Sequence, residues 1–100
     1  MASRDIEAQR EKWRAGFDPR RPLAEQLDQP HAPAWQLAHV MNVGEHTVYS
    51  EGKAFDAAVR AGDLHEAARH IPCIIIGATH RFPTAAFILW WESAGRTAAE

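Results

Sequence analysis

The longest helical pattern in the chain covers residues 33–62 and reads PAWQLAHVMNVGEHTVYSEGKAFDAAVRAG. Apolar residues recur along this segment at about every 3.6 positions, which is the period of an α-helix. Pro33 suits a first helical position, because the N–H that proline lacks would be unpaired there. We therefore predict a long central helix whose apolar stripe faces the core and consists of Leu37, Val40, Met41, Gly44, Val48, Phe55 and Val59.

Glycines mark the weak points and the end of this pattern. Gly44 and Gly52 lie inside it, and each costs about 1 kcal/mol relative to alanine, so we expect a break or kink near Gly52. Gly62 suits the left-handed residue that ends a helix. Asp63 and Glu66 then have the spacing of a capping box, which predicts that a second helix begins and forms a helical hairpin with the first.

The segment after residue 70 allows two assignments. Pro72 interrupts the helical pattern, and the run Cys73-Ile74-Ile75-Ile76 is typical of either a buried strand or a buried helix. We favour the helix. Pro83 suits another helix start, and a helix over residues 84–93 would be apolar around its whole circumference.

The amino-terminal segment carries the signals of a helix with a thin apolar face. Ser3 can cap it and Gly16 can follow its last turn, which predicts a helix over residues 4–15. Ile6 and Trp13 provide most of its apolar surface, so this helix must pack against another element to be stable. A short helix is expected over residues 22–27.

Together these elements predict one all-α domain over residues 1–100, a compact bundle of about five helices with a long central helix. The alternative is an α+β fold with a small sheet formed by residues 73–78 and 87–91. Residues 1–21 hold six cations and four acids, whereas the rest of the chain holds five cations and nine acids. A solvated amphipathic helix is the simpler explanation of this asymmetry. The alternative is that the amino-terminal helix and loop act as a docking arm, either for an acidic partner or for the body of the protein itself.

The composition is that of a globular protein, with 46% hydrophobic and 24% charged residues. Its longest apolar runs, residues 71–78 and 85–91, are shorter than the roughly 18 residues of a spanning helix. The first residues lack a secretory signal, and the single cysteine, Cys73, has no disulfide partner, so we expect a cytoplasmic protein. Nine of the eleven cationic residues are arginine, a bias typical of a GC-rich bacterial gene.

Known catalytic and metal-binding motifs are missing from the sequence. It has no glycine-rich phosphate loop, dinucleotide fingerprint, GxSxG or paired CxxC. His65 and His70 are one residue too far apart for a zinc-protease motif, because on a helix their rings point about 140° apart. Glu66, His70 and Cys73 could share a ligand only on an unbroken helix, which Pro72 prevents. We therefore predict no metal, no cofactor and no catalytic residue, and an enzyme is not favoured.

A second stripe runs beside the aliphatic one on the predicted central helix. Its members combine aromatic rings with polar groups, as expected of a partly solvated groove or an interface. They are Trp35, His39, Asn42, His46 and Tyr49, spaced by four, three, four and three residues. Histidines at the edge of the core are the simpler interpretation, and the alternative is a groove that binds a ligand or a contact between copies of the chain.

The absence of catalytic motifs and the excess of apolar surface together predict a non-enzymatic protein-interaction module: an adaptor, accessory subunit or inhibitor. Aromatic residues dominate many interfaces, so the expected contact residues are Phe87, Trp90, Trp91 and Trp13. They would bind a protein partner or a second copy of the chain. The alternatives are a small ligand-binding protein or enzyme that uses the Trp, His and Tyr groove, and a DNA-binding regulator. Acidic residues are interleaved with the arginine cluster of residues 4–21, so the net field is small and nucleic acid is an improbable partner. No membrane contact is expected.

Overall fold

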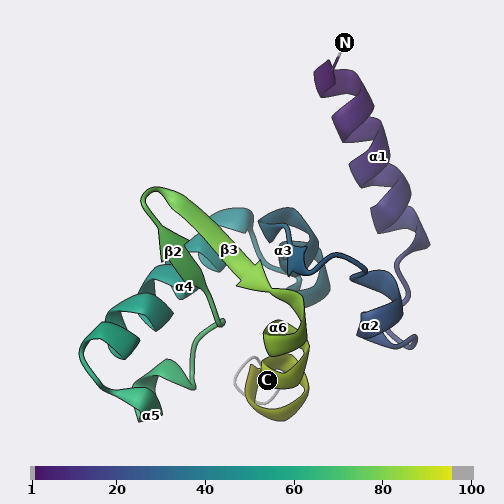
Figure 1. The fold of residues 1–100 in the computed structure, drawn as a ribbon. Helices are drawn as coiled ribbons and strands as arrows, with labels where there is room; N and C mark the ends of the chain where they lie inside the picture. Colours follow the sequence, from purple (N-terminus) through teal and green to yellow (C-terminus); the bar gives the residue numbers. More distant parts are fainter. Residues whose placement is uncertain (1, 96–100) are drawn as a thin grey trace.

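The computed structural model describes residues 2–95, and the side chains of residues 5–93. The elements in chain order are α1 (Ala2–Gly16), α2 (Leu23–Gln26), β1 (His31–Ala32), α3 (Ala34–Met41), α4 (Glu45–Arg60), α5 (Leu64–Ala67), β2 (Ile74–Ile76), β3 (Thr79–Pro83), α6 (Thr84–Trp90) and a π-helical turn (Trp91–Gly95) that continues α6. The protein is helix-rich, as predicted, but it also contains a small sheet, so the prediction of a purely helical bundle is not confirmed (Figure 1).

The sheet is antiparallel and has the strand order β1-β3-β2. Ile74, Ile75 and Ile76 form β2, so the favoured helix at this position is wrong. These isoleucines are β-branched and suit a pleated strand, and a partner strand, β3, follows after a turn of two residues. The α+β alternative placed one strand correctly within residues 73–78. Its second strand, residues 87–91, is helical instead.

The predicted long central helix is two helices, α3 and α4. The break lies at Asn42, whose left-handed backbone (φ 58°, ψ 48°) ends α3. The N–H of Val43 then donates to the carbonyl oxygen of Ala38 at 3.0 Å, which closes the helix end. Gly44 has an extended backbone and precedes the first residue of α4. Asparagine is one of the few residues that adopt the left-handed region readily, and this signal was missed.

The kink expected near Gly52 does not occur, because Gly52 lies within α4. A side chain is excluded here for a packing reason. A Cβ atom at this position would lie 2.9 Å from Sγ of Cys73 and 3.1 Å from Cε1 of Phe82. Gly52 therefore allows α4 to approach β2 and β3 closely.

The helical hairpin between α4 and α5 is confirmed. Gly62 has a positive φ of 74°, which an L side chain rarely adopts. Asp63 caps α5, since its Oδ1 accepts a hydrogen bond of 3.0 Å from the backbone N–H of Glu66. The cap has the predicted partners, although α5 is a single turn.

One cluster of buried residues connects the elements. Leu37, Val48, Ile71, Phe82 and Phe87 are its largest fully buried side chains. Helix α6 begins after Pro83, as predicted, and lies beside the sheet and α2 (Figure 1).

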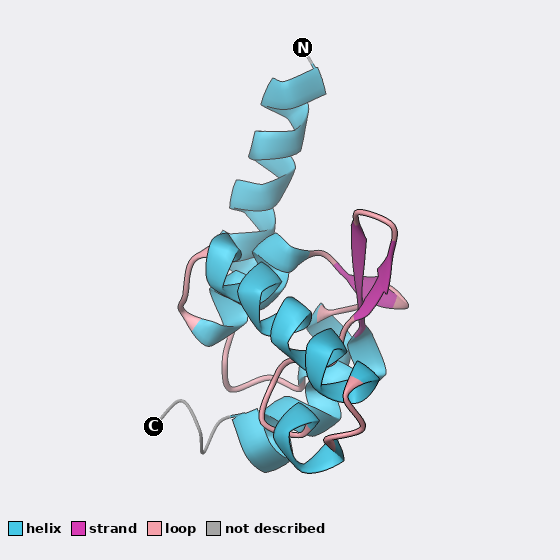
Figure 2. Ribbon diagram, turned by 90° about the vertical axis from the view of Figure 1, so that its left-hand side faces the viewer, coloured by secondary structure: helices cyan, strands magenta, loops and turns pink. Residues whose placement is uncertain are grey.

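Helix α1 projects from this body, and its first turns extend away from the other elements (Figure 2). Among the described side chains, those of α1 that pack on the core lie in its last turns: Trp13, and Phe17 just beyond the helix. Among the described residues, no helix has the length and apolar character needed to cross a membrane.

Candidate functional site

The amino-terminal arm is fastened to the body by two stacked aromatic rings. Trp13 and Phe17 are four residues apart, and their ring centroids lie 5.2 Å from each other. The Trp13 ring meets the ring of Trp35 edge to face at 5.4 Å. Its Nε1 donates a hydrogen bond of 3.1 Å to the carbonyl oxygen of Gln26 at the end of α2. Trp13 thus holds α1 against both α2 and α3.

The side chain of Gln26 fixes the loop between α1 and α2. Its Oε1 accepts a hydrogen bond of 2.8 Å from the backbone N–H of Asp18. Its Nε2 donates to the carbonyl oxygens of Asp18 at 2.8 Å and Arg21 at 3.2 Å. A single half-buried amide therefore joins three backbone groups, so the loop has a defined shape.

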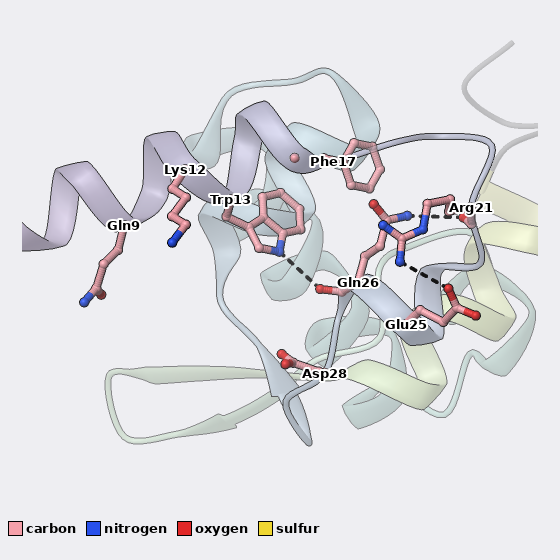
Figure 3. A pocket seen from close by; sticks show the side chains of 9 residues that line it. Gln9, Lys12, Trp13, Phe17, Arg21, Glu25, Gln26 and Asp28 are labelled. Atoms are coloured by element: carbon pink, nitrogen blue, oxygen red, sulfur yellow. Dashed lines mark hydrogen bonds and ion pairs between the residues drawn. The ribbon is translucent and has the colours of Figure 1, made fainter.

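An open cleft lies between this loop and the last turns of α1, and we call it the α1–α2 cleft. Its volume is about 450 Å³, and its lining residues are Gln9, Lys12, Trp13, Gly16, Phe17, Arg21, Glu25, Gln26 and Asp28. Figure 3 shows Trp13 and Phe17 side by side along the cleft, with Gln26 held against them. Gly16 leaves space here, because a Cβ atom added to it would have no neighbour within 4 Å.

The rim of the cleft carries balanced charges. Arg21 and Glu25 form an ion pair with an N–O distance of 3.3 Å. Lys12 lies on α1 and Asp28 lies across the opening from it (Figure 3). With two cations and two acids around aromatic rings, the cleft is better suited to an uncharged apolar group than to an anion or a cation.

The four predicted interface residues occupy different environments. Phe87 and Trp90 are 0% and 8% exposed, and Nε1 of Trp90 donates to the carbonyl oxygen of Ala68 at 3.1 Å. Trp91 is half-buried beside them, stacked on Phe87. The outward apolar side chain of α6 is Leu89, which is 70% exposed and which the sequence analysis did not name. A protein contact on α6 stays a prediction. Trp13 is the one predicted interface residue in the cleft.

The predicted groove is split, because its residues were placed on one continuous helix and the break at Asn42 separates them. Trp35, His39 and Asn42 line a small polar hollow with Arg14 and Glu45. Tyr49 lies instead against His80 of the hairpin, with ring centroids 5.2 Å apart. His46 is exposed at the start of α4 and lines neither the hollow nor the cleft.

Two arginines that the sequence analysis did not single out cover the Trp35 ring. The guanidinium carbons of Arg10 and Arg14 lie 5.3 Å and 5.5 Å from its centroid, which is cation–π geometry.

Phe17 was also missed as a contact residue. Its four-residue spacing from Trp13 could have revealed it, since residues at this spacing are neighbours on a helix.

The predicted pair of Glu66 and His70 exists, with Nε2 of His70 3.0 Å from Oε1 of Glu66. A third group completes it, because Nδ1 of His70 lies 3.2 Å from Oε2 of Glu51 on α4. This contact joins α4 to the segment before β2. With both ring nitrogens facing carboxylates, His70 has no free nitrogen for a metal.

Cys73 is buried beneath the hairpin, and burial raises the pKa of its thiol above the ordinary value of 9.0. A raised pKa keeps the thiol protonated and weakens it as a nucleophile. Among the described residues, no three His, Cys, Asp or Glu side chains are grouped so as to hold a metal ion.

A comparison of the chain with protein families, with curated proteins and with solved structures gave no match.

Proposed function

We propose that the protein is a non-enzymatic interaction module that binds a partner protein through the α1–α2 cleft. The observation that carries the proposal is the open cleft of about 450 Å³ beside Trp13 and Phe17. Tryptophan is one of the residue types enriched among the few side chains that dominate the free energy of binding at protein interfaces.

The chemistry of the cleft indicates what part of the partner enters it. Its rings offer apolar contact, and its rim is neutral because Lys12 and Arg21 are balanced by Glu25 and Asp28. An apolar side chain such as leucine, methionine or phenylalanine fits this setting, and a charged ligand would gain no net attraction. The exposed polar face of α1 beside the cleft then provides the rim of the contact.

Preorganisation supports binding as well. The side chain of Gln26 fixes the loop, and Trp13 is held by its hydrogen bond to the backbone of Gln26. A partner that enters such a cleft orders few additional side chains, so less conformational entropy opposes binding.

The test fills the cleft with a new side chain and leaves Trp13 and Phe17 unchanged. Gly16→Leu places a side chain in the space beside Trp13, and it should not lower stability, because Gly16 has no neighbour within 4 Å and leucine favours helix. The matched control is Ala15→Leu, which adds the same side chain at an exposed position outside the cleft.

Each of the three proteins is used to capture partners from a lysate of the source organism, and a recovered protein is then titrated in purified form by calorimetry. We expect the wild type and Ala15→Leu to bind it equally, and Gly16→Leu to bind at least about tenfold more weakly. Equal binding by all three proteins would show that the cleft does not take part in partner binding. If the wild type instead retains a small molecule and the Gly16→Leu variant does not, the cleft binds a small ligand and not a partner protein.

A further inference from the structure

The hairpin formed by β2 and β3 has one face covered and one face open. Ile75 and His80 point toward α4, where His80 contacts Tyr49. The neighbouring side chains point the other way, and Ile74 and Ile76 are 48% and 64% exposed. The outer face of the hairpin therefore presents two large apolar residues, which the α1–α2 cleft does not include.

Strand β2 is also an edge of the sheet, since within residues 2–95 it pairs only with β3. The hairpin turn has two residues, so Ile76 and Thr79 next to it form a hydrogen-bonded pair. Hydrogen-bonded and non-hydrogen-bonded pairs alternate along an antiparallel ladder. The N–H and C=O of Ile75 thus point away from β3, toward the free edge.

Nothing in β2 protects this edge. Natural edge strands carry lysine, proline or a bulge that discourages pairing. The three residues of β2 are isoleucine, without a charge or a proline, and the tip of the hairpin stands clear of the helices (Figure 2).

We infer that β2 pairs with β2 of a second copy of this chain, antiparallel and centred on Ile75. In this register Ile75 lies opposite Ile75 of the other copy and exchanges two backbone hydrogen bonds with it. Ile74 of each copy lies opposite Ile76 of the other. The four exposed isoleucines then form one apolar cluster on the outer face of a continuous sheet with three strands from each copy.

The strand is its own best partner for two reasons. Three identical residues match themselves at each position of the antiparallel register, which a strand of mixed composition does not do. Charge does not oppose the pairing, because Arg81 lies on β3 and its counterpart in the second copy is about 14 Å or more away, across three strand spacings. At physiological ionic strength charges at that distance are largely screened.

The contact is short, so the dimer should be weak and concentration-dependent. The first test is sedimentation equilibrium over a wide range of protein concentration. We expect the weight-average mass of the wild type to approach that of a dimer, and Ile76→Lys to remain monomeric. The matched control is Leu64→Lys, which places the same charge at an equally exposed apolar position on α5 and should dimerise like the wild type. A wild type that stays monomeric at every concentration would overturn the inference.

The second test fixes the register, and it does not depend on the stability of the lysine variant. Ile74→Cys and Ile76→Cys are prepared separately, then oxidised alone and as a mixture. Residues 74 and 76 of different copies lie opposite each other, at a distance that a disulfide spans, whereas two copies of residue 74 are too far apart. We expect covalent dimers in the mixture only. Crosslinking of either variant alone, or none in the mixture, would overturn the proposed pairing.

The two surfaces can be separated experimentally. Gly16→Leu lies outside the hairpin and should dimerise as the wild type does, even if partner binding through the cleft is lost. If the cleft binds no partner, the proposed dimer is unaffected. If the chain does not dimerise, the proposed binding of a partner in the cleft is unaffected.

Discussion

Helices α1 and α6 are held in place by different interactions. Most side chains of α1 are exposed, and its ion pairs, such as Arg14 with Glu11, lie on the surface. Surface ion pairs contribute about 0–1 kcal/mol each. Helix α6 instead buries Thr84, Phe87 and Trp90. The arm thus depends on local helix propensity, on the anchor formed by Trp13 and Phe17, and on the stacking of Arg10 and Arg14 on Trp35. Helix α6 depends on tertiary packing of its own buried side chains, and mutations should separate the two.

The largest effect is expected in α6. Phe87→Ala removes a fully buried ring from the core and leaves a cavity, so it should lower the free energy of unfolding by about 3–5 kcal/mol. Urea unfolding followed by circular dichroism measures this. A loss below about 1 kcal/mol would mean that α6 is not held by its packing.

The same substitution at two glycines should give effects of opposite sign. Gly52→Ala pushes a methyl group against Cys73, at 2.9 Å, and overpacking of this kind costs about 1–3 kcal/mol. Gly16→Ala meets no atom and should raise stability by up to about 1 kcal/mol, the difference in helix propensity. Urea midpoints of both variants provide the comparison. Equal shifts would show that α4 does not approach the hairpin as closely as described.

A smaller effect should appear at alkaline pH. Burial raises the pKa of Cys73 above 9.0, so in the window above that pH the unfolded chain loses the thiol proton while the folded chain keeps it. The unfolded state then binds fewer protons, and stability falls as pH rises; well below pH 9.0 the contribution of the thiol is fully present. We expect the wild type to lose more stability than Cys73→Ala between about pH 8 and pH 10. Parallel pH profiles would contradict a buried thiol.

The smallest effect is expected at the free end of the arm. Ile6 is exposed on the projecting part of α1, so Ile6→Ala should change the free energy of unfolding by less than about 0.5 kcal/mol. The same urea titration measures it. A change above about 1 kcal/mol would show that the first turns of α1 pack against something in solution.

Local signals in the sequence predicted local structure well. Gly62 and Asp63 predicted the end of α4 and the cap of α5, because both act through backbone groups within a few residues. Pro83 located the start of α6 for the same reason. The break at Asn42 was missed, since a left-handed asparagine is common in turns but gives no periodic signal. That one residue decided whether Trp35 and Tyr49 share a groove.

Features that depend on distant partners were harder to predict. The isoleucine run could be a strand or a helix, and only its pairing with residues 79–81 decides between them. The partner strand β3 contains polar residues such as His80 and Arg81, so an apolar pattern in the sequence does not reveal it. Trp13 was recognised as a contact residue, but the cleft beside it also requires Gln26, whose role in closing the loop is tertiary and leaves no pattern in the sequence.

The pairing of β1 with β3 has a consequence for the order of folding. It joins distant parts of the chain, and Thr84 donates a side-chain hydrogen bond to the carbonyl oxygen of Gln29, 55 residues away. The α4–α5 and β2–β3 hairpins close short loops, whereas this contact closes a long one at a greater entropic cost. On the ribosome, β1 cannot pair until β3 has emerged, so this part of the sheet forms late although β1 is synthesised early.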